Sequence, residues 1–99
     1  MIIVAGTVRV PLERVEELRE IARQTVEAVR TEDGCILYSF SADLTDPGLL
    51  RIYEQWESRE HLKAHLTQPH MKPWRDKLAE IGASGRDIKT YEAGEGTPV

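Results

Sequence analysis

The chain has 99 residues, 40% of them hydrophobic and 30% charged, which suits one globular domain. Its net charge of −4, with Lys and Arg interspersed among Glu and Asp, argues against nucleic acid and anionic membranes as partners, because both attract basic surfaces. The single cysteine, Cys35, excludes an intrachain disulfide, and the first residues lack the charge and apolar length of a signal peptide. We therefore expect a cytoplasmic protein.

Residues 2–10 form a short segment that is rich in β-branched side chains, and they predict a strand that ends at Pro11.

A long amphipathic helix is predicted after this strand. From Leu12 onward, apolar side chains recur at spacings of three and four, and charged residues fill the intervening positions. This period predicts a helix of about five turns. Gly34 stands in a position that suits the cap at its C-terminal end.

The central part of the chain predicts a hairpin followed by a second helix. Residues 35–43 and 49–57 have strand composition, and the Thr-Asp-Pro-Gly turn between them is too short for a parallel crossover. Ser58 is a predicted N-cap of a short helix, and Pro73 favours the start of another helix near residue 72.

Residues 86–93 predict a fourth strand, so the expected order is β-α-β-β-α-β. This order is typical of the α+β ferredoxin-like fold, in which two helices cover one face of a four-stranded antiparallel sheet. We expect one domain over residues 1–93 and a flexible tail over residues 94–99.

Alternation at period two separates the strand residues into two faces. The face expected beneath the helices carries Val4, Val8, Val10, Ile36, Tyr38, Phe40, Leu50, Ile52 and Trp56. The opposite face is mixed but too apolar to face only water, and two helices cannot cover both faces. A symmetric homodimer formed through the sheet is the favoured solution, and the alternative is a monomer with some exposed apolar side chains.

Two features of the sequence suggest chemistry. Glu54 shares the buried face, where a carboxylate needs a partner or takes up a proton, so it is either a structural group or part of a pocket. His61, His65 and His70 lie within ten residues, and the favoured pocket residues are His65 and His70. Metal binding through the His61 and His65 pair is disfavoured, because the glutamate of the zinc motif H-E-x-x-H is absent.

Residues 54–72 carry a more specific signal. They read EQWESREHLKAHLTQPHMK, with Glu-x-Trp at the end of a strand, Ala-His-Leu on the short helix and Pro-His after it. This segment, with the upstream Asp-Gly-Cys at residues 33–35 and Tyr38, resembles the antibiotic biosynthesis monooxygenase family, and within it the bacterial quinol monooxygenases. The resemblance implies a dimeric α+β barrel with one pocket per subunit. It also implies oxidation of a quinol or polyphenol by molecular oxygen without any cofactor or metal.

The resemblance also assigns expected roles to residues. His65 and His70 would supply a base or a hydrogen bond, and Glu54 would orient a histidine. The expected substrate-binding walls are aromatic or apolar: Trp56, Tyr38, Phe40, Met71 and Trp74. Haem degradation, known among relatives, is disfavoured because Gly6, Thr7 and His65 replace its Asn and Trp. An isomerase acting on a small signalling metabolite and a non-catalytic binding module remain alternatives.

Overall fold

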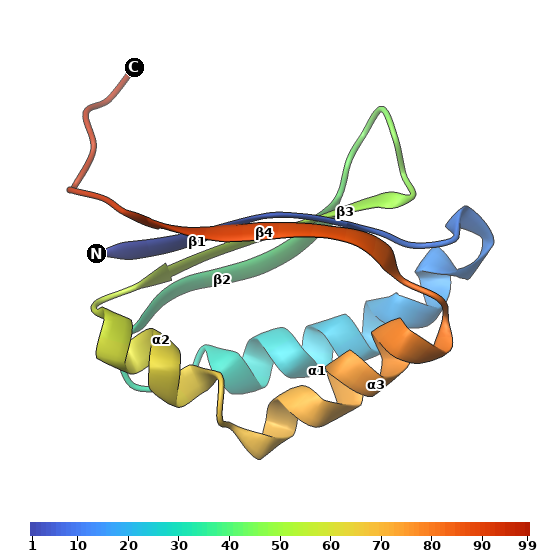
Figure 1. Ribbon diagram of the computed structural model, residues 1–99, viewed down its shortest axis with the longest axis horizontal. Coiled ribbons are helices and arrows are strands. Elements are labelled where there is room, and N and C mark those ends of the chain that lie inside the picture. The colour runs from blue at the N-terminus through green and yellow to red at the C-terminus, as the bar shows by residue number, and fades with distance from the viewer.

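Four antiparallel strands form one sheet in the computed structural model, which describes residues 1–99 (Figure 1). The strands are β1 (Ile2–Arg9), β2 (Cys35–Ala42), β3 (Leu49–Trp56) and β4 (Ser84–Glu92), in the order β2-β3-β1-β4. The predicted ferredoxin-like β-α-β-β-α-β fold is therefore confirmed. The fourth strand begins two residues earlier than the sequence predicted.

All helices lie on one face of the sheet (Figure 1). They are the 3₁₀ segment Leu12–Leu18, α1 (Arg19–Val29), α2 (Arg59–His65), the 3₁₀ turn Pro69–Met71 and α3 (Lys72–Glu80). The predicted five-turn helix is thus a 3₁₀ segment that continues into a shorter α-helix. The N-cap prediction is confirmed, because the Ser58 hydroxyl accepts a hydrogen bond from the backbone N–H of His61.

The core lies between the sheet and the helices, and it differs from the prediction at one position. Trp56 and Tyr38 are almost completely buried, whereas Ile36, expected beside them, is 50% exposed. The reason is a β-bulge, since Cys35 pairs with Trp56 and Leu37 with Gln55, so Ile36 has no partner on β3. One extra residue shifts the alternation, and Cys35 takes the inward place instead.

β1 is one of the two central strands of the sheet. It pairs with β3 on one side and with β4 on the other, where Ile2 lies opposite Glu92. Gly6 allows this close approach, because a Cβ atom at Gly6 would stand 2.0 Å from the carbonyl oxygen of Asp87. Residues 94–99 form no regular secondary structure. No helix has the length and apolar character needed to cross a bilayer, and the cytoplasmic location stays a prediction.

Candidate active site

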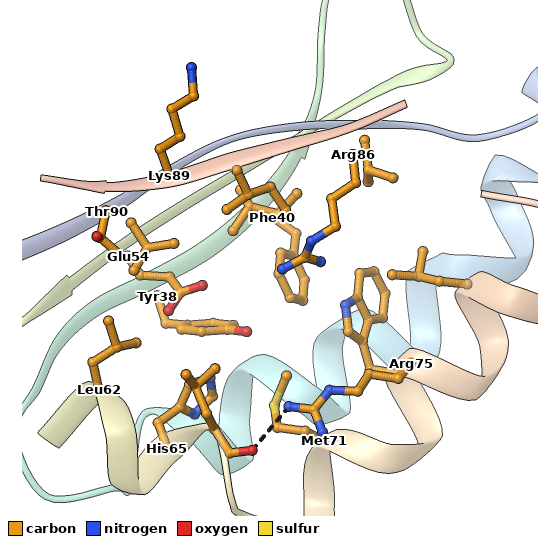
Figure 2. Close-up of a pocket in the computed structure, with 17 residues that line it drawn as sticks. Tyr38, Phe40, Glu54, Leu62, His65, Met71, Arg75, Arg86, Lys89 and Thr90 are labelled. Carbon is orange, nitrogen blue, oxygen red and sulfur yellow. Dashed lines mark hydrogen bonds between the residues drawn. The ribbon is translucent and has the colours of Figure 1, made fainter. Parts of the chain in front are cut away.

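A cavity of about 220 Å³ lies between the sheet and the segment that contains α2 and α3 (Figure 2). Most of its lining is hydrophobic. Of the residues predicted for the site, its lining contains Tyr38, Phe40, Glu54, His65, Met71 and Trp74. The cavity exceeds the roughly 150 Å³ space that holds a benzene ring in an engineered apolar cavity. The volume is therefore sufficient for one aromatic ring.

Stacked aromatic rings form one end of this cavity. The rings of Phe40 and Trp74 lie parallel, with centroids 4.3 Å apart and planes 9° apart. Tyr38 meets Phe40 edge to face at 5.2 Å. Such pairs have few alternative rotamers when buried, so they provide a rigid flat surface for an aromatic ligand.

Glu54 brings a carboxyl group into this apolar space from near the C-terminal end of β3. One of its oxygens accepts a hydrogen bond of 2.8 Å from Nε1 of Trp56. Burial nevertheless raises the pKa of Glu54 from its ordinary 4.5 to about 7, because the charged form loses its hydration. Near neutral pH the Glu54 carboxyl is therefore divided between the protonated and ionised forms.

Tyr38 points its hydroxyl into the same cavity from β2 (Figure 2). Burial, together with the nearby carboxylates of Glu54 and Glu32, raises the pKa of this phenol far above its ordinary value. Tyr38 consequently remains a neutral hydrogen-bond donor at any physiological pH.

His65 forms the floor of the cavity and is held by a carboxylate that the sequence did not suggest. Its side chain is 2% exposed, and its ring stacks on Trp56 with centroids 4.7 Å apart. Nδ1 of His65 lies 3.0 Å from the carboxylate of Glu32, which leaves Nε2 as its free ring nitrogen. The same Glu32 oxygen lies 2.7 Å from Nε2 of His70.

Glu32 is positioned by the loop between α1 and β2. Its backbone N–H bonds the carbonyl of Val29, and its carbonyl accepts from the N–H of Cys35. Gly34 has a φ of +80° and packs against the ring of His61. A Cβ atom at Gly34 would lie only 2.1 Å from Cγ of His61. Glycine is required there for both its backbone angle and its lack of a side chain, and this contact ties the Glu32 loop to α2.

The positions of two predicted site residues, and the contact expected of a third, differ from the prediction. Trp56 is fully buried behind His65 and does not line the cavity. His70 lies in a surface hollow outside the cavity, with its side chain 32% exposed. The carboxylate in contact with the histidines belongs to Glu32, whereas Glu54 was expected to orient one of them.

The arrangement around His61 does not resemble a metal centre. Nδ1 of His61 lies 2.8 Å from the hydroxyl of Ser58, and no group of three or more His, Cys, Asp or Glu side chains is arranged to hold a metal. His61 and His65 therefore lie on one helix face, but their side chains are not arranged around a common metal site.

Three cationic side chains border the cavity, and sequence reasoning did not identify them. Arg75 donates to the backbone carbonyl of Leu66, and Lys89 extends away from the cavity (Figure 2). Arg86 extends from β4 toward Phe40 and the cavity, and it forms no ion pair within the chain (Figure 2). Its guanidinium acts on Glu54 by lowering the pKa of that carboxyl, against the larger effect of burial.

Comparison with known proteins assigns the family. A family model described as antibiotic biosynthesis monooxygenase matches residues 1–77. The chain belongs to this family. Most of the site described above, including Glu32, His65 and His70, lies within the matched residues, and Arg86 lies beyond them.

Two curated proteins are similar in sequence to this chain over part of their own length. The uncharacterized protein sll1783 of Synechocystis is 32% identical over 94 residues, which cover 95% of this chain and 64% of that protein. The probable quinol monooxygenase YgiN of Escherichia coli is 37% identical over 61 residues, or 54% of this chain and 59% of YgiN. The chain therefore spans less than two thirds of both relatives.

Solved structures of similar proteins extend over nearly the whole chain. A crystal structure from Deinococcus radiodurans, named as a candidate antibiotic biosynthesis monooxygenase, is 34% identical with a TM-score of 0.90, covering 100% of this chain and 98% of that one. A conserved protein of Methanosarcina mazei is 27% identical with a TM-score of 0.85, covering 94% and 92%. These structures support the fold independently of the match over residues 1–77.

Proposed function

We propose that this protein is a cofactor-independent monooxygenase that oxidises a quinol or a related phenol with molecular oxygen. The observation that carries the proposal is the buried imidazole of His65, fixed at Nδ1 by Glu32 and free at Nε2 on the floor of an aromatic-lined cavity. A base held in this way meets the geometric requirement for removing a phenolic proton from a bound ring.

The proposed reaction begins with proton transfer and continues with oxygen. Nε2 of His65 takes the proton of one substrate hydroxyl, and the electron-rich anion then gives an electron to oxygen. Overall, one quinol and one O₂ give one hydroxyquinone and one water. One oxygen atom of O₂ becomes the new hydroxyl group on the ring, and the other is reduced to water. The apolar cavity favours this path because it excludes water from the reactive intermediates.

Charged and polar groups around the cavity support formation of the anion. Arg86 has no carboxylate partner within the chain, so its guanidinium is free to face a phenolate. The neutral Tyr38 hydroxyl can donate to the same oxygen, since its pKa is raised well above the ordinary value. Donors already aimed at the developing charge stabilise it without reorganisation.

Oxygen uptake with a panel of reduced quinones tests the proposal. We expect uptake above the autoxidation blank, and His65→Gln should reduce that excess by about 100-fold or more, the usual contribution of a positioned base. Gln68→Ala is the matched control, because Gln68 follows α2 but lies outside the cavity. An absence of enzymatic uptake with every quinol tested would contradict the proposal.

Two other functions receive less support. An isomerase acting on a small signalling metabolite would be favoured by a cluster of cations in the cavity. Arg86 and Arg75 both border the cavity, but Arg75 donates to the backbone carbonyl of Leu66 and Lys89 extends away from the cavity. A non-catalytic binding module would use the cavity, but it would not need a buried histidine fixed by a carboxylate.

We also propose that two copies pair through their sheets. The helices cover one face only (Figure 1). The strand register places the exposed side chains of Leu37, Tyr53 and Tyr91 on the other face. A symmetric dimer would bury these side chains. Light scattering on the purified protein should give twice the mass of one chain, and Tyr53→Glu should shift the protein toward the monomer. A native protein that remains monomeric at micromolar concentration would contradict the pairing.

A further inference from the structure

The carboxylate of Glu32 connects the buried cavity to the protein surface. On its inner side it bonds Nδ1 of His65, whose side chain is 2% exposed, and on its outer side it bonds Nε2 of His70, whose side chain is 32% exposed. Glu32 itself is 9% exposed. The three side chains thus form a continuous hydrogen-bonded line from the cavity floor to a surface hollow.

A single carboxylate oxygen is shared by the two rings. Oε2 of Glu32 lies 3.0 Å from His65 and 2.7 Å from His70. One carboxylate balances one imidazolium, whereas two imidazolium rings this close repel each other. Protonation of one histidine is therefore expected to favour loss of a proton from the other.

We propose that Glu32 and His70 form a proton exit for the cavity, with His65 as its inner end. The proton from a bound phenol goes to Nε2 of His65, which becomes an imidazolium against Glu32. The proposal requires a His70 ring that donates from Nε2 to Glu32 and also carries a proton on Nδ1; this Nδ1 proton passes to water, and the ring becomes neutral. One O–H bond breaks and one N–H bond forms in the cavity; at the surface one N–H bond breaks and one O–H bond to the accepting water forms, and the net charge of the three side chains is unchanged.

The surroundings of this proton exit support the inference. Tyr38 and Trp56 pack against His65 in the interior, so water has little access to its ring from that side. Other ionisable groups nearby are Glu54 in the cavity, Cys35 at the start of β2, and Asp33 with His61 in the surface hollow. None of these four groups bridges the two histidines as Glu32 does.

The inference rests on the proposed function, because it requires a phenol that loses its proton in the cavity. The test therefore follows proton release apart from oxidation. The probe is 4-nitrophenol, whose anion absorbs visible light, mixed with the native protein in weak buffer that contains a pH indicator. With native protein we expect phenolate absorbance and about one released proton per phenolate formed.

The variants separate a proton exit from a structural role of His70. In His70→Gln, phenolate should still form, but proton release should fall close to zero because the proton remains on His65. In His70→Ala, added imidazole should restore release. Gln68→Ala, in the same surface hollow, should release protons as the native protein does. A change confined to packing would alter the affinity for 4-nitrophenol and leave the proton count per phenolate unchanged.

The outcomes also distinguish this inference from the proposed function. Phenolate formation with undiminished proton release in His70→Gln would overturn the proton exit alone. A native protein that forms no phenolate would overturn the proposed function, and the proton exit with it.

Discussion

Replacing Glu54 by glutamine should stabilise the protein at alkaline pH and have little effect at acidic pH. The variant keeps the shape of the side chain and the oxygen that accepts from Trp56, but it removes the ionisable group. Burial raises the pKa of Glu54 from 4.5 to about 7. A difference of this size corresponds to about 3 kcal/mol of folding free energy.

The sign follows from proton binding in the two states. Between about pH 4.5 and 7 the folded protein holds the Glu54 proton more tightly than the unfolded chain, so this group makes stability fall as pH rises through that interval. Above pH 7 the whole cost of the buried charge is present. Glu54→Gln escapes this cost, and its stability relative to the native protein should be about 2–3 kcal/mol more favourable at pH 8 than at pH 5.

Urea unfolding followed by tryptophan fluorescence measures this difference, at one protein concentration for both proteins and both pH values. Comparing variant with native protein at each pH cancels the titration of every other group. Glu57→Gln, at an exposed glutamate just after β3, is the control and should show no such difference. An equal stability change for Glu54→Gln at pH 5 and pH 8 would refute the assignment of a desolvated carboxyl.

Three further substitutions test the supports of the site. Gly34→Ala should destabilise the protein by more than about 2 kcal/mol in urea unfolding, because the new Cβ would overlap the ring of His61 at a positive φ. Trp74→Ala should cost about 3–5 kcal/mol in the same assay and weaken 4-nitrophenol binding, since it removes the ring stacked on Phe40. Ser58→Ala should cost only about 1 kcal/mol in thermal or urea unfolding, as expected for loss of an N-cap, and an unchanged midpoint would contradict that role.

The order and type of the main elements could be predicted from the sequence because each depends on local periodicity. The exception at Ile36 shows the limit of such reasoning. A bulge arises from pairing between two strands, and nothing in the residues around Ile36 marks which strand takes the extra position. Similarly, the 3₁₀ start of the first helix has the same apolar spacing as an α-helix.

The candidate site was predicted only in part, for a related reason. Glu54 and His65 stood out because each places a titratable group on an apolar face. Glu32 did not, since its contacts with His65 and His70 join residues 33 and 38 positions apart, and its loop looked like a simple helix end. Arg86 was missed because a charged residue on an edge strand normally faces solvent.

The pairing of β1 with β4 has a consequence for how this protein folds. Ile2 and Glu92 are opposite each other in the sheet, and contacts so distant along the chain carry a large loop-closure cost that slows folding. β4 also supplies part of the cavity lining, through Arg86 and Ile88. The cavity is therefore incomplete in any intermediate in which β4 is still detached, so a ligand that binds the cavity would favour the state with β4 paired. Such a ligand should slow unfolding and protect the amides of β1 and β4 from hydrogen exchange together.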